Sequence, residues 1–143
     1  GRTFIQPTQK LRERSVDIKL NALSEEIDGK RIIIIDDSIV RGTTSFKIVQ
    51  MLKNAGAKEV HMRISSPPVL NPCYFGIDFS SKEHLIAANY SIEEIRESIQ
   101  ADSLGFLSVE NLLKTPIGTA KENYCTGCFT GNYPMQVPVH EAT

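Results

Sequence analysis

Two adjacent carboxylates stand directly before a loop that carries one glycine and four hydroxyl side chains. The carboxylates are Asp36 and Asp37, the loop covers residues 38–45, and its glycine is Gly42. The hydroxyls can donate to phosphate oxygens, and Gly42 lets the backbone approach a bulky anion. The carboxylates repel phosphate, but they suit vicinal hydroxyls or a Mg²⁺ ion that keeps much of its water. A ligand with hydroxyls at one end and a phosphate one short loop away is a ribose 5-phosphate, which this segment is predicted to bind.

The elements around the loop are those that would position such a site. Four isoleucines at 32–35 predict a short strand that is buried on both faces. Val49, Leu52 and Ala55 recur at three-residue steps and predict a helix that ends at Gly56. In an open α/β sheet, ligands bind at the carboxyl end of a strand, beside the positive end of the following helix. The alternative is a solvated acidic turn with a hydroxyl-rich helix cap. Such a turn would not need the carboxylates, the glycine and the hydroxyls together.

A second strand is predicted after this helix. Residues 59–66 alternate apolar and polar side chains, and the strand–helix–strand order predicts a parallel unit. Residues 76–78 are expected to form a short edge strand and turn.

Short helices are predicted further along the chain. Ser91 and Glu94 have the spacing of a capping box. Three isoleucines would line one face of the helix that starts there: Ile92, Ile95 and Ile99. Residues 101–107 are interpreted as a connector, and Ser108 is expected to cap another short helix.

The cysteines form a second candidate site. Cys125 and Cys128 make a C-x-x-C pair, and Cys73 lies far upstream. Such a pair is ambiguous among redox, zinc and iron–sulfur chemistry. A thioredoxin-like site needs the pair at a strand-to-helix junction, whereas this pair lies in a segment rich in Gly, Asn and Pro. Three unrelated buried thiols are the remaining alternative.

Composition excludes several classes of function. The 143 residues carry a net charge of −1, and the pI is about 6.3, so neither a nucleic-acid nor an anionic-membrane partner is indicated. No apolar run approaches the ~20 residues of a membrane span. Three cysteines, an odd number, argue against a disulfide framework and for a reducing, cytoplasmic setting.

Residues 34–45 resemble the phosphoribosylpyrophosphate (PRPP) motif of the type I phosphoribosyltransferases. The amino-acid sequence of residues 38–45 is most similar to that of the glutamine PRPP amidotransferase family, the amidophosphoribosyltransferases. Residues 76–78, 86–89 and 102–105 resemble the same family, so the resemblance covers nearly all of the chain. It implies an α/β fold: part of a type I phosphoribosyltransferase fold, a parallel sheet flanked by helices, with a short helical C-terminal tail.

The resemblance also implies a division of the chain. Residues 1–90 would be a partial phosphoribosyltransferase domain, with a flexible active-site loop at 1–20 and the PRPP motif at 31–45. Residues 91–143 would be the helical tail that carries the C-x-x-C pair. The family's glutaminase domain and pyrophosphate-binding loop are not in this sequence, so we expect the C-terminal part of a longer enzyme, inactive alone.

The implied enzyme converts PRPP and glutamine-derived ammonia to 5-phosphoribosylamine, the committed step of de novo purine synthesis. In such an enzyme, Asp36 and Asp37 would have the catalytic role and would contact the ribose hydroxyls and Mg²⁺. Purine nucleotides would be feedback inhibitors, and a homo-oligomer is expected. The implied substrate-binding residues are Asp36, Asp37, Ser38, Ile39, Val40, Arg41, Gly42, Thr43, Thr44 and Ser45.

One subgroup of the family holds a [4Fe–4S] cluster, and the resemblance places this chain in it. Cys73, Cys125 and Cys128 match three of the four cluster ligands. The fourth would lie upstream of Gly1 in the family sequence.

Two other functions compete with this interpretation. A PRPP-sensing regulator would keep the phosphate loop for binding only, but it would usually carry a DNA-binding module and a basic surface. A non-catalytic metal-binding module organised by the cysteines would leave Asp36, Asp37 and the loop unexplained.

Overall fold

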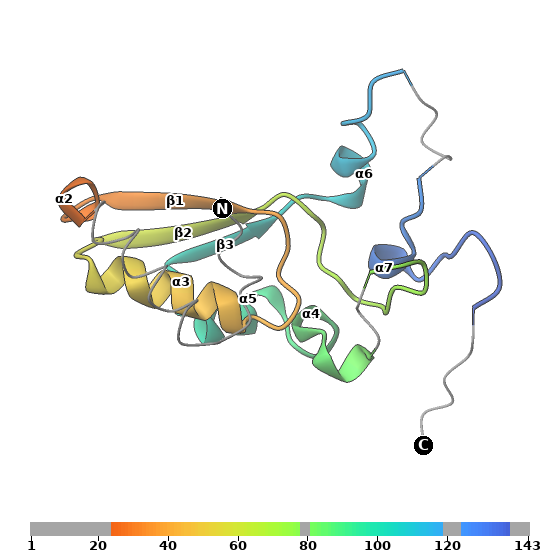
Figure 1. The fold of residues 1–143 in the computed structure, drawn as a ribbon, viewed down its shortest axis with the longest axis horizontal. Helices are drawn as coiled ribbons and strands as arrows, with labels where there is room; N and C mark the ends of the chain where they lie inside the picture. The colour runs from red at the N-terminus through yellow and green to blue at the C-terminus, as the bar shows by residue number, and fades with distance from the viewer. Residues whose placement is uncertain (1–23, 78–80, 119–123, 138–143) are drawn as a thin grey trace.

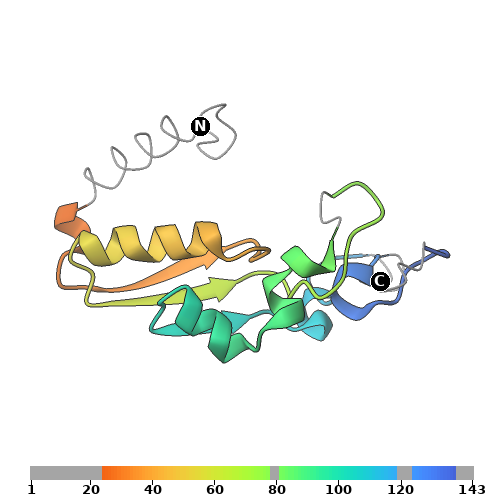
Figure 2. The ribbon, with the colours of Figure 1, turned by 90° about the horizontal axis from the view of Figure 1, so that it is seen from below.

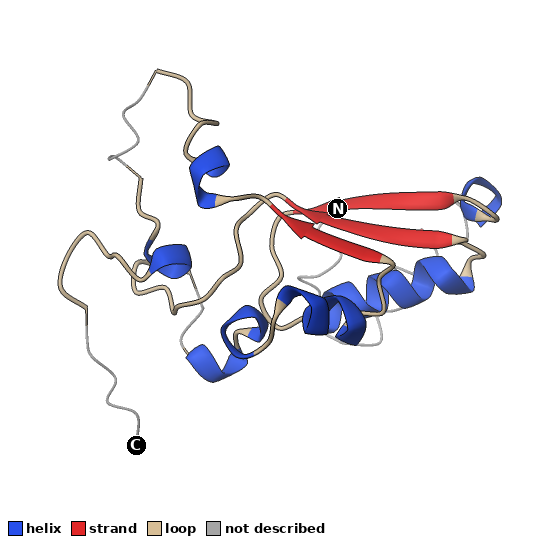
Figure 3. Ribbon diagram, turned by 180° about the vertical axis from the view of Figure 1, so that it is seen from behind, coloured by secondary structure: helices blue, strands red, loops and turns tan. Residues whose placement is uncertain are grey.

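The computed structural model describes residues 24–77, 81–118 and 124–137, and a three-stranded parallel sheet lies at its centre (Figures 1 and 3). The strand order is β1 (Arg31–Asp36), β2 (Glu59–Ile64) and β3 (Ser103–Phe106). Residues 1–20, the expected flexible loop, lie outside the described residues. The helices are α2 (Ser24–Ile27), α3 (Thr43–Asn54), the 3₁₀ helix η2 (Lys82–His84), α4 (Ile86–Asn89), α5 (Ile92–Ser98), α6 (Val109–Leu112) and α7 (Gly127–Thr130).

Helices α3 and α5 cover the same face of the sheet, as Figures 1 and 2 show. The central strand β2 alternates, and its residues Val60, Met62 and Ile64 are buried against these helices. Helix α3 contributes Val49 and Leu52 to this core. Helix α5 contributes Ile95 and Ile99. Burial of each such side chain stabilises the fold by about 1.5–3 kcal/mol. The parallel strand–helix–strand unit and the predicted α/β class are therefore confirmed.

Strand β1 is not buried on both faces, contrary to the prediction. Ile32 and Ile34 pack against the core, but Ile33 and Ile35 are 67% and 78% exposed. Because both helices lie on one side, nothing in the described part of the chain covers the opposite face of β1 (Figure 1). Four consecutive isoleucines are apolar on both faces, so their pattern alone cannot show that only one face is covered.

The uncovered face of the sheet is polar beyond β1. His61 of β2 bonds through Nδ1 to Ser103 Oγ of β3 at 2.8 Å, and through Nε2 to Glu59 Oε2 at 3.0 Å. Arg63 also donates to Ser103 Oγ at 3.0 Å. These side chains join β2 to β3 on the face that none of the described helices covers.

The end of α3 follows the prediction. Gly56, with φ of 93°, takes the left-handed conformation just past the helix, and its N–H donates to Lys53 O at 3.0 Å. The N–H of Ala57 donates to Leu52 O at 3.0 Å, which completes a Schellman motif. A side chain at position 56 would also collide with Asp28, so this glycine lets the chain turn tightly from α3 into β2.

Two segments differ from the prediction. Within residues 101–107, interpreted as a connector, β3 pairs with β2, so this part of the expected helical tail belongs to the sheet. Leu104 and Phe106 of β3 pack against the core. Conversely, Gly76 and Ile77 form a bend rather than an edge strand, and Asp78 lies outside the described residues.

The helix caps in the second half of the chain are confirmed. The Ser91 hydroxyl accepts from the Glu94 N–H and the Glu94 carboxylate accepts from the Ser91 N–H, which is a capping box. Ser108 Oγ accepts from the Asn111 N–H at the start of α6. Ile92 is 47% exposed, so it does not share the buried face of Ile95 and Ile99. Among the described residues, no helix is both long and apolar enough to cross a membrane.

Candidate functional site

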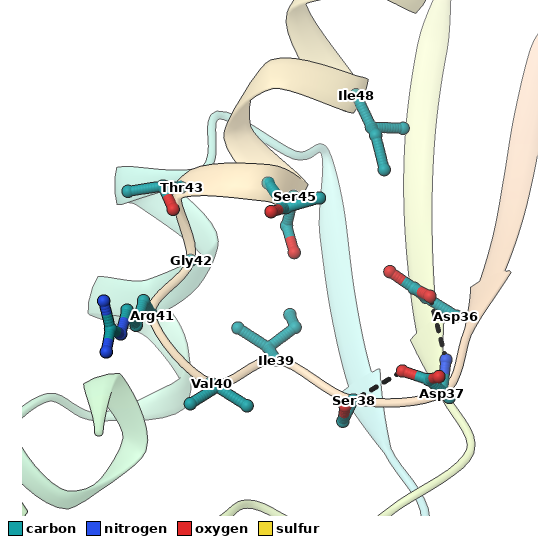
Figure 4. A pocket seen from close by; sticks show the side chains of 11 residues that line it. Asp36, Asp37, Ser38, Ile39, Val40, Arg41, Gly42, Thr43, Ser45 and Ile48 are labelled. Carbon is teal, nitrogen blue, oxygen red and sulfur yellow. Dashed lines mark hydrogen bonds between the residues drawn. The ribbon is translucent and has the colours of Figure 1, made fainter. Parts of the chain in front are cut away.

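The loop between β1 and α3 surrounds an open pocket of about 480 Å³ (Figure 4). Asp36 points into the enclosed space from the end of the strand, and Ser45 points into it from the first turn of the helix. Arg41 points away from the pocket. The structure thus brings all ten predicted substrate-binding residues to one pocket, together with Ile48: Asp36, Asp37, Ser38, Ile39, Val40, Arg41, Gly42, Thr43, Thr44 and Ser45.

The two carboxylates are held at the strand end by hydrogen bonds. Asp36 Oδ1 accepts from the Asp37 N–H at 2.9 Å, and Asp37 Oδ1 accepts from Ser38 Oγ at 2.9 Å. The carbonyl of Asp36 accepts from both the N–H and the hydroxyl of Ser65, at 2.9 and 3.1 Å. Since Ser65 follows β2, the carboxyl ends of β1 and β2 are joined directly behind the carboxylates.

The start of α3 faces the pocket with free donors. Gly42 is the N-cap residue, with φ of 78°, and it has no side chain that could accept from the first turn. The first backbone bond of the helix runs from the Phe46 N–H to Gly42 O at 2.9 Å. In the described part of the chain, the N–H groups of residues 43–45 have no acceptor. A helix start with free N–H groups and a positive dipole end is a binding site for an anion.

The loop rests on a buried floor. The side chain of Ile39 is 2% exposed and that of Ser45 is 3% exposed. From behind, the N–H of Ile86 donates to Val40 O at 2.8 Å. The Cδ1 atom of Ile86 lies 2.8 Å from the place that a Cβ would take at Gly42. The loop is therefore held from both ends and from below, with the pocket side left open.

The three cysteines form the second candidate site: helix α7, which contains Cys128, lies beside the loop that follows β2 and contains Cys73 (Figure 1). All three are free thiols, with Cys125 exposed and the other two half-buried. The carbonyl of Cys128 accepts from the N–H groups of Leu70 and Asn71, at 2.9 and 3.0 Å. Burial raises the pKa of the Cys128 thiol, and the nearby thiols of Cys73 and Cys125 raise this pKa further.

Tyr133 lies among the same thiols. Burial, then Tyr74 and the three cysteines, raise the pKa of the Tyr133 phenol. Within residues 24–77, 81–118 and 124–137, however, no three His, Cys, Asp or Glu side chains are arranged to hold a metal ion. The soft thiol donors fit a zinc or iron–sulfur centre in their chemistry, but their arrangement is not that of a closed metal site.

Sequence reasoning missed two residues that shape these sites. Ile86 supports the phosphate loop, and Tyr133 packs beside the cysteines. Both act through contacts between segments far apart in sequence, so no local pattern marks them. A weak signal was present for Ile86, because it lies in residues 86–89, whose sequence resembles the amidotransferases.

Comparison with known proteins gives the fold and the site a context. Residues 3–65 match the family model for the phosphoribosyl transferase domain, a range that includes β1, the pocket loop, α3 and β2. The sheet with its flanking helices matches a type I phosphoribosyltransferase fold.

The chain is also similar to curated amidophosphoribosyltransferases. It is 56% identical over 142 residues to that of Archaeoglobus fulgidus, which covers 99% of this chain and 31% of the relative. It is 56% identical over 141 residues to that of Bacillus subtilis, covering 96% and 29% of the two. The chain therefore spans about a third of the length of the curated relatives that it matches.

Two solved structures resemble the chain. One is the glutamine PRPP amidotransferase of Bacillus subtilis complexed with ADP and GMP, with a TM-score of 0.74 and 49% identity over 99% of this chain and 32% of that chain. The other is described as the allosteric regulatory enzyme of purine biosynthesis, with a TM-score of 0.73 and 49% identity over 96% and 30%.

Proposed function

We propose that this chain provides the PRPP-binding part of an amidophosphoribosyltransferase and corresponds to the C-terminal part of that enzyme. The enzyme would join PRPP and glutamine-derived ammonia into 5-phosphoribosylamine in purine synthesis. One observation carries the proposal: the free N–H groups at the start of α3 and the carboxylates at the end of β1 face one pocket. The similarity to amidophosphoribosyltransferases over nearly the whole chain supports it.

The two ends of the pocket have different binding tasks. The N–H groups and hydroxyls of residues 43–45 bind the 5-phosphate, because they supply several donors and the helix dipole favours an anion. Asp36 and Asp37 accept hydrogen bonds from the ribose hydroxyls. Fixed at both ends, the sugar would present its reacting carbon to ammonia in a defined orientation, which lowers the entropic part of the barrier.

A Mg²⁺ ion would be held at Asp36 and Asp37 together with the substrate. Oxygen ligands from one or two carboxylates, with water and phosphate, are what this ion prefers. Its positive charge would neutralise part of the substrate's phosphate charge when bound. The hydrogen bonds that the two carboxylates accept, from the Asp37 N–H and from Ser38 Oγ, fix their geometry and fit this use.

The cysteines are proposed as three ligands of a [4Fe–4S] cluster: Cys73, Cys125 and Cys128. Thiolates are the usual ligands of such clusters. The main-chain hydrogen bonds from Leu70 and Asn71 to the Cys128 carbonyl bring the C-x-x-C segment beside the segment that leads to Cys73, which supports the assignment. The fourth ligand would come from outside this sequence. When bound, the cluster would cross-link the segment around Cys73 to the C-x-x-C segment.

The proposal also covers how the enzyme would be regulated and how its subunits would assemble. Purine nucleotides are proposed as feedback inhibitors, since a similar solved structure is complexed with ADP and GMP. We also propose a cytoplasmic homo-oligomer.

Titration with ribose 5-phosphate and Mg²⁺, followed by amide chemical shifts, tests the binding site. The amides of Gly42, Thr43 and Thr44 should move together and saturate. A Thr43→Val, Thr44→Val variant should bind more weakly, whereas the matched control Thr115→Val in the segment after α6 should bind as the parent does. Shifts confined to residues remote from α3 would refute the site.

The enzymatic assignment is tested by a chimera. This chain should replace the 141 matching residues of the Bacillus subtilis relative and preserve ammonia-dependent formation of phosphoribosylamine. A folded chimera that binds PRPP but forms no product would contradict the assignment.

A further inference from the structure

We infer that Tyr133 is a positioning residue for the cysteine site: its side chain locks the C-x-x-C turn onto the segment that carries Cys73. The lock consists of Tyr133, Gly127 and Pro72. Its packing stands independently of any metal, whereas its role rests on the proposed function of the cysteines.

The first contact of the lock is a long-range hydrogen bond. Tyr133 Oη donates to the carbonyl of Pro72 at 2.7 Å, across 61 positions of sequence. Since Pro72 directly precedes Cys73, this bond fixes the backbone next to the isolated cysteine.

The second contact explains why one of the two residues between the paired cysteines, Gly127, is a glycine. A Cβ at Gly127 would lie 2.2 Å from Cδ1 and 2.5 Å from Cε1 of the Tyr133 ring. The backbone of Gly127 is not in the left-handed region, so its conformation alone does not require glycine. Gly127 is also buried. The ring therefore occupies the space of the missing side chain and lies directly on the turn between Cys125 and Cys128.

Two aromatic neighbours also pack against the ring. Tyr74 meets Tyr133 edge to face, with ring centroids 5.3 Å apart and planes at 76°. Phe75 packs at a tilt, with centroids 6.2 Å apart. Edge-to-face pairs are favourable beyond their buried area. Both residues come directly after Cys73. The Tyr133 ring therefore packs against the Cys73 segment as well as against the turn between Cys125 and Cys128.

The backbone completes the arrangement. The N–H groups of Leu70 and Asn71 both donate to the Cys128 carbonyl. The two cysteine-bearing segments are thus joined both by main-chain bonds and by Tyr133. Packing of the polypeptide keeps the thiols together before any metal arrives, which lowers the ordering cost of binding.

Thiol alkylation in the reduced, chelator-treated chain tests this inference. The variants are Gly127→Ala, Tyr133→Ala and the two combined, with Tyr133→Phe as the conservative change. Gly105→Ala is the matched control, because a Cβ there makes only ordinary contact with the flexible Arg63 side chain, at 3.4 Å. Mass spectrometry gives the rate at each cysteine, relative to the denatured chain.

Gly127→Ala should raise alkylation of Cys128 by about tenfold, since overpacking of this size opens the local structure. Tyr133→Ala should act similarly, and the double variant should be no worse than Tyr133→Ala alone, because the added methyl then meets no ring. Tyr133→Phe keeps the ring and should have a smaller effect.

Thermal unfolding of the sheet and the shifts of Gly42 with ribose 5-phosphate should stay as in the parent for every variant. This separates failure of the lock from failure of the phosphate site. Parent-like thiol rates in Gly127→Ala, or additive effects in the double variant, would overturn the inference. If Tyr133→Ala does not fold, the comparison of Gly127→Ala with Gly105→Ala still decides it.

Discussion

The N–H of Ile86 and the carbonyl of Val40 form a 2.8 Å hydrogen bond that joins the start of α4 to the middle of the phosphate loop. Leu85, the residue before it, is 1% exposed and anchors this end of α4 in the interior. Asn89 holds the other end, because its Nδ2 donates to the carbonyl of Leu85 at 2.8 Å. Helix α4 is therefore a support for the pocket rather than a separate surface element.

Replacement of Ile86 by proline should isolate this bond. Ile86 is the first residue of α4 and follows Leu85 in extended conformation, so proline fits the backbone but has no N–H to donate. Ile86→Ala removes a comparable part of the side chain and keeps the N–H. Ile86→Pro should bind ribose 5-phosphate about fivefold more weakly than Ile86→Ala, since such a bond contributes about 1 kcal/mol. Equal affinities by calorimetry would show that the bond does not order the loop.

Alanine at Gly42 should destabilise the fold for two reasons. The backbone there has φ of 78°, and the new Cβ would lie 2.8 Å from Ile86 Cδ1. Gly29→Ala is the matched control, because Gly29 has φ of 70° but nothing within 4 Å of its Cβ position. Strain alone costs about 1–3 kcal/mol, so Gly42→Ala should lower the free energy of unfolding by more than Gly29→Ala. Ile86→Val removes Cδ1 and should recover the difference between them in urea unfolding. A loss in Gly42→Ala no greater than in Gly29→Ala would argue against the contact.

The chemistry of the pocket could be predicted from sequence because it is local. Asp36, Asp37 and Gly42 lie within seven consecutive residues, and the strand and helix that position them have clear patterns. The end of α3 at Gly56 was predictable for the same reason.

Tertiary arrangement was not predictable from those patterns. The exposure of Ile33 and Ile35 depends on which face the helices cover, and no property of the strand itself decides this. Strand β3 has only four residues, and one of them, Gly105, has no side chain to show alternation. Its place in the sheet depends on pairing with β2.

The stability of the sheet should depend on pH through Asp102. Its carboxylate accepts from the Val60 N–H at 2.7 Å, and this bond is the main reason that its pKa lies below the ordinary 3.8. Lys53, at 3.5 Å, adds a smaller lowering. A lowered pKa in the folded state means that the charged form stabilises folding above 3.8. This stabilisation is lost as the pH falls below 3.8 and passes the lowered pKa that Asp102 has in the folded state.

Asp102→Asn should therefore be less stable than the parent at neutral pH, and the gap should close in acid. The side chain is 37% exposed, so solvent screening keeps the neutral-pH difference at about 1 kcal/mol or less. Glu83→Gln, in the exposed η2 segment, serves as a control for loss of one negative charge. Urea unfolding from neutral pH to below 3.8 measures the effect. If the difference in free energy of unfolding between the parent and Asp102→Asn widened in acid, the charged form of Asp102 would not be the stabilising one.

The carboxylates and the helix start should be separable by the ligand that is used. Asp36→Asn with Asp37→Asn removes two negative charges but leaves the N–H groups of α3 in place. Binding of ribose 5-phosphate with Mg²⁺ should weaken by about tenfold or more, because hydrogen bonds to charged groups contribute about 1.5–3 kcal/mol each. Inorganic phosphate without Mg²⁺ should bind as well as before, or slightly better, since repulsion by the carboxylates is gone. Asp28→Asn with Glu25→Gln, both before the start of β1, is the control for the loss of two negative charges. Calorimetry with the two ligands gives both affinities, and a parallel loss for both would mean that the carboxylates maintain the loop's shape instead of binding the sugar.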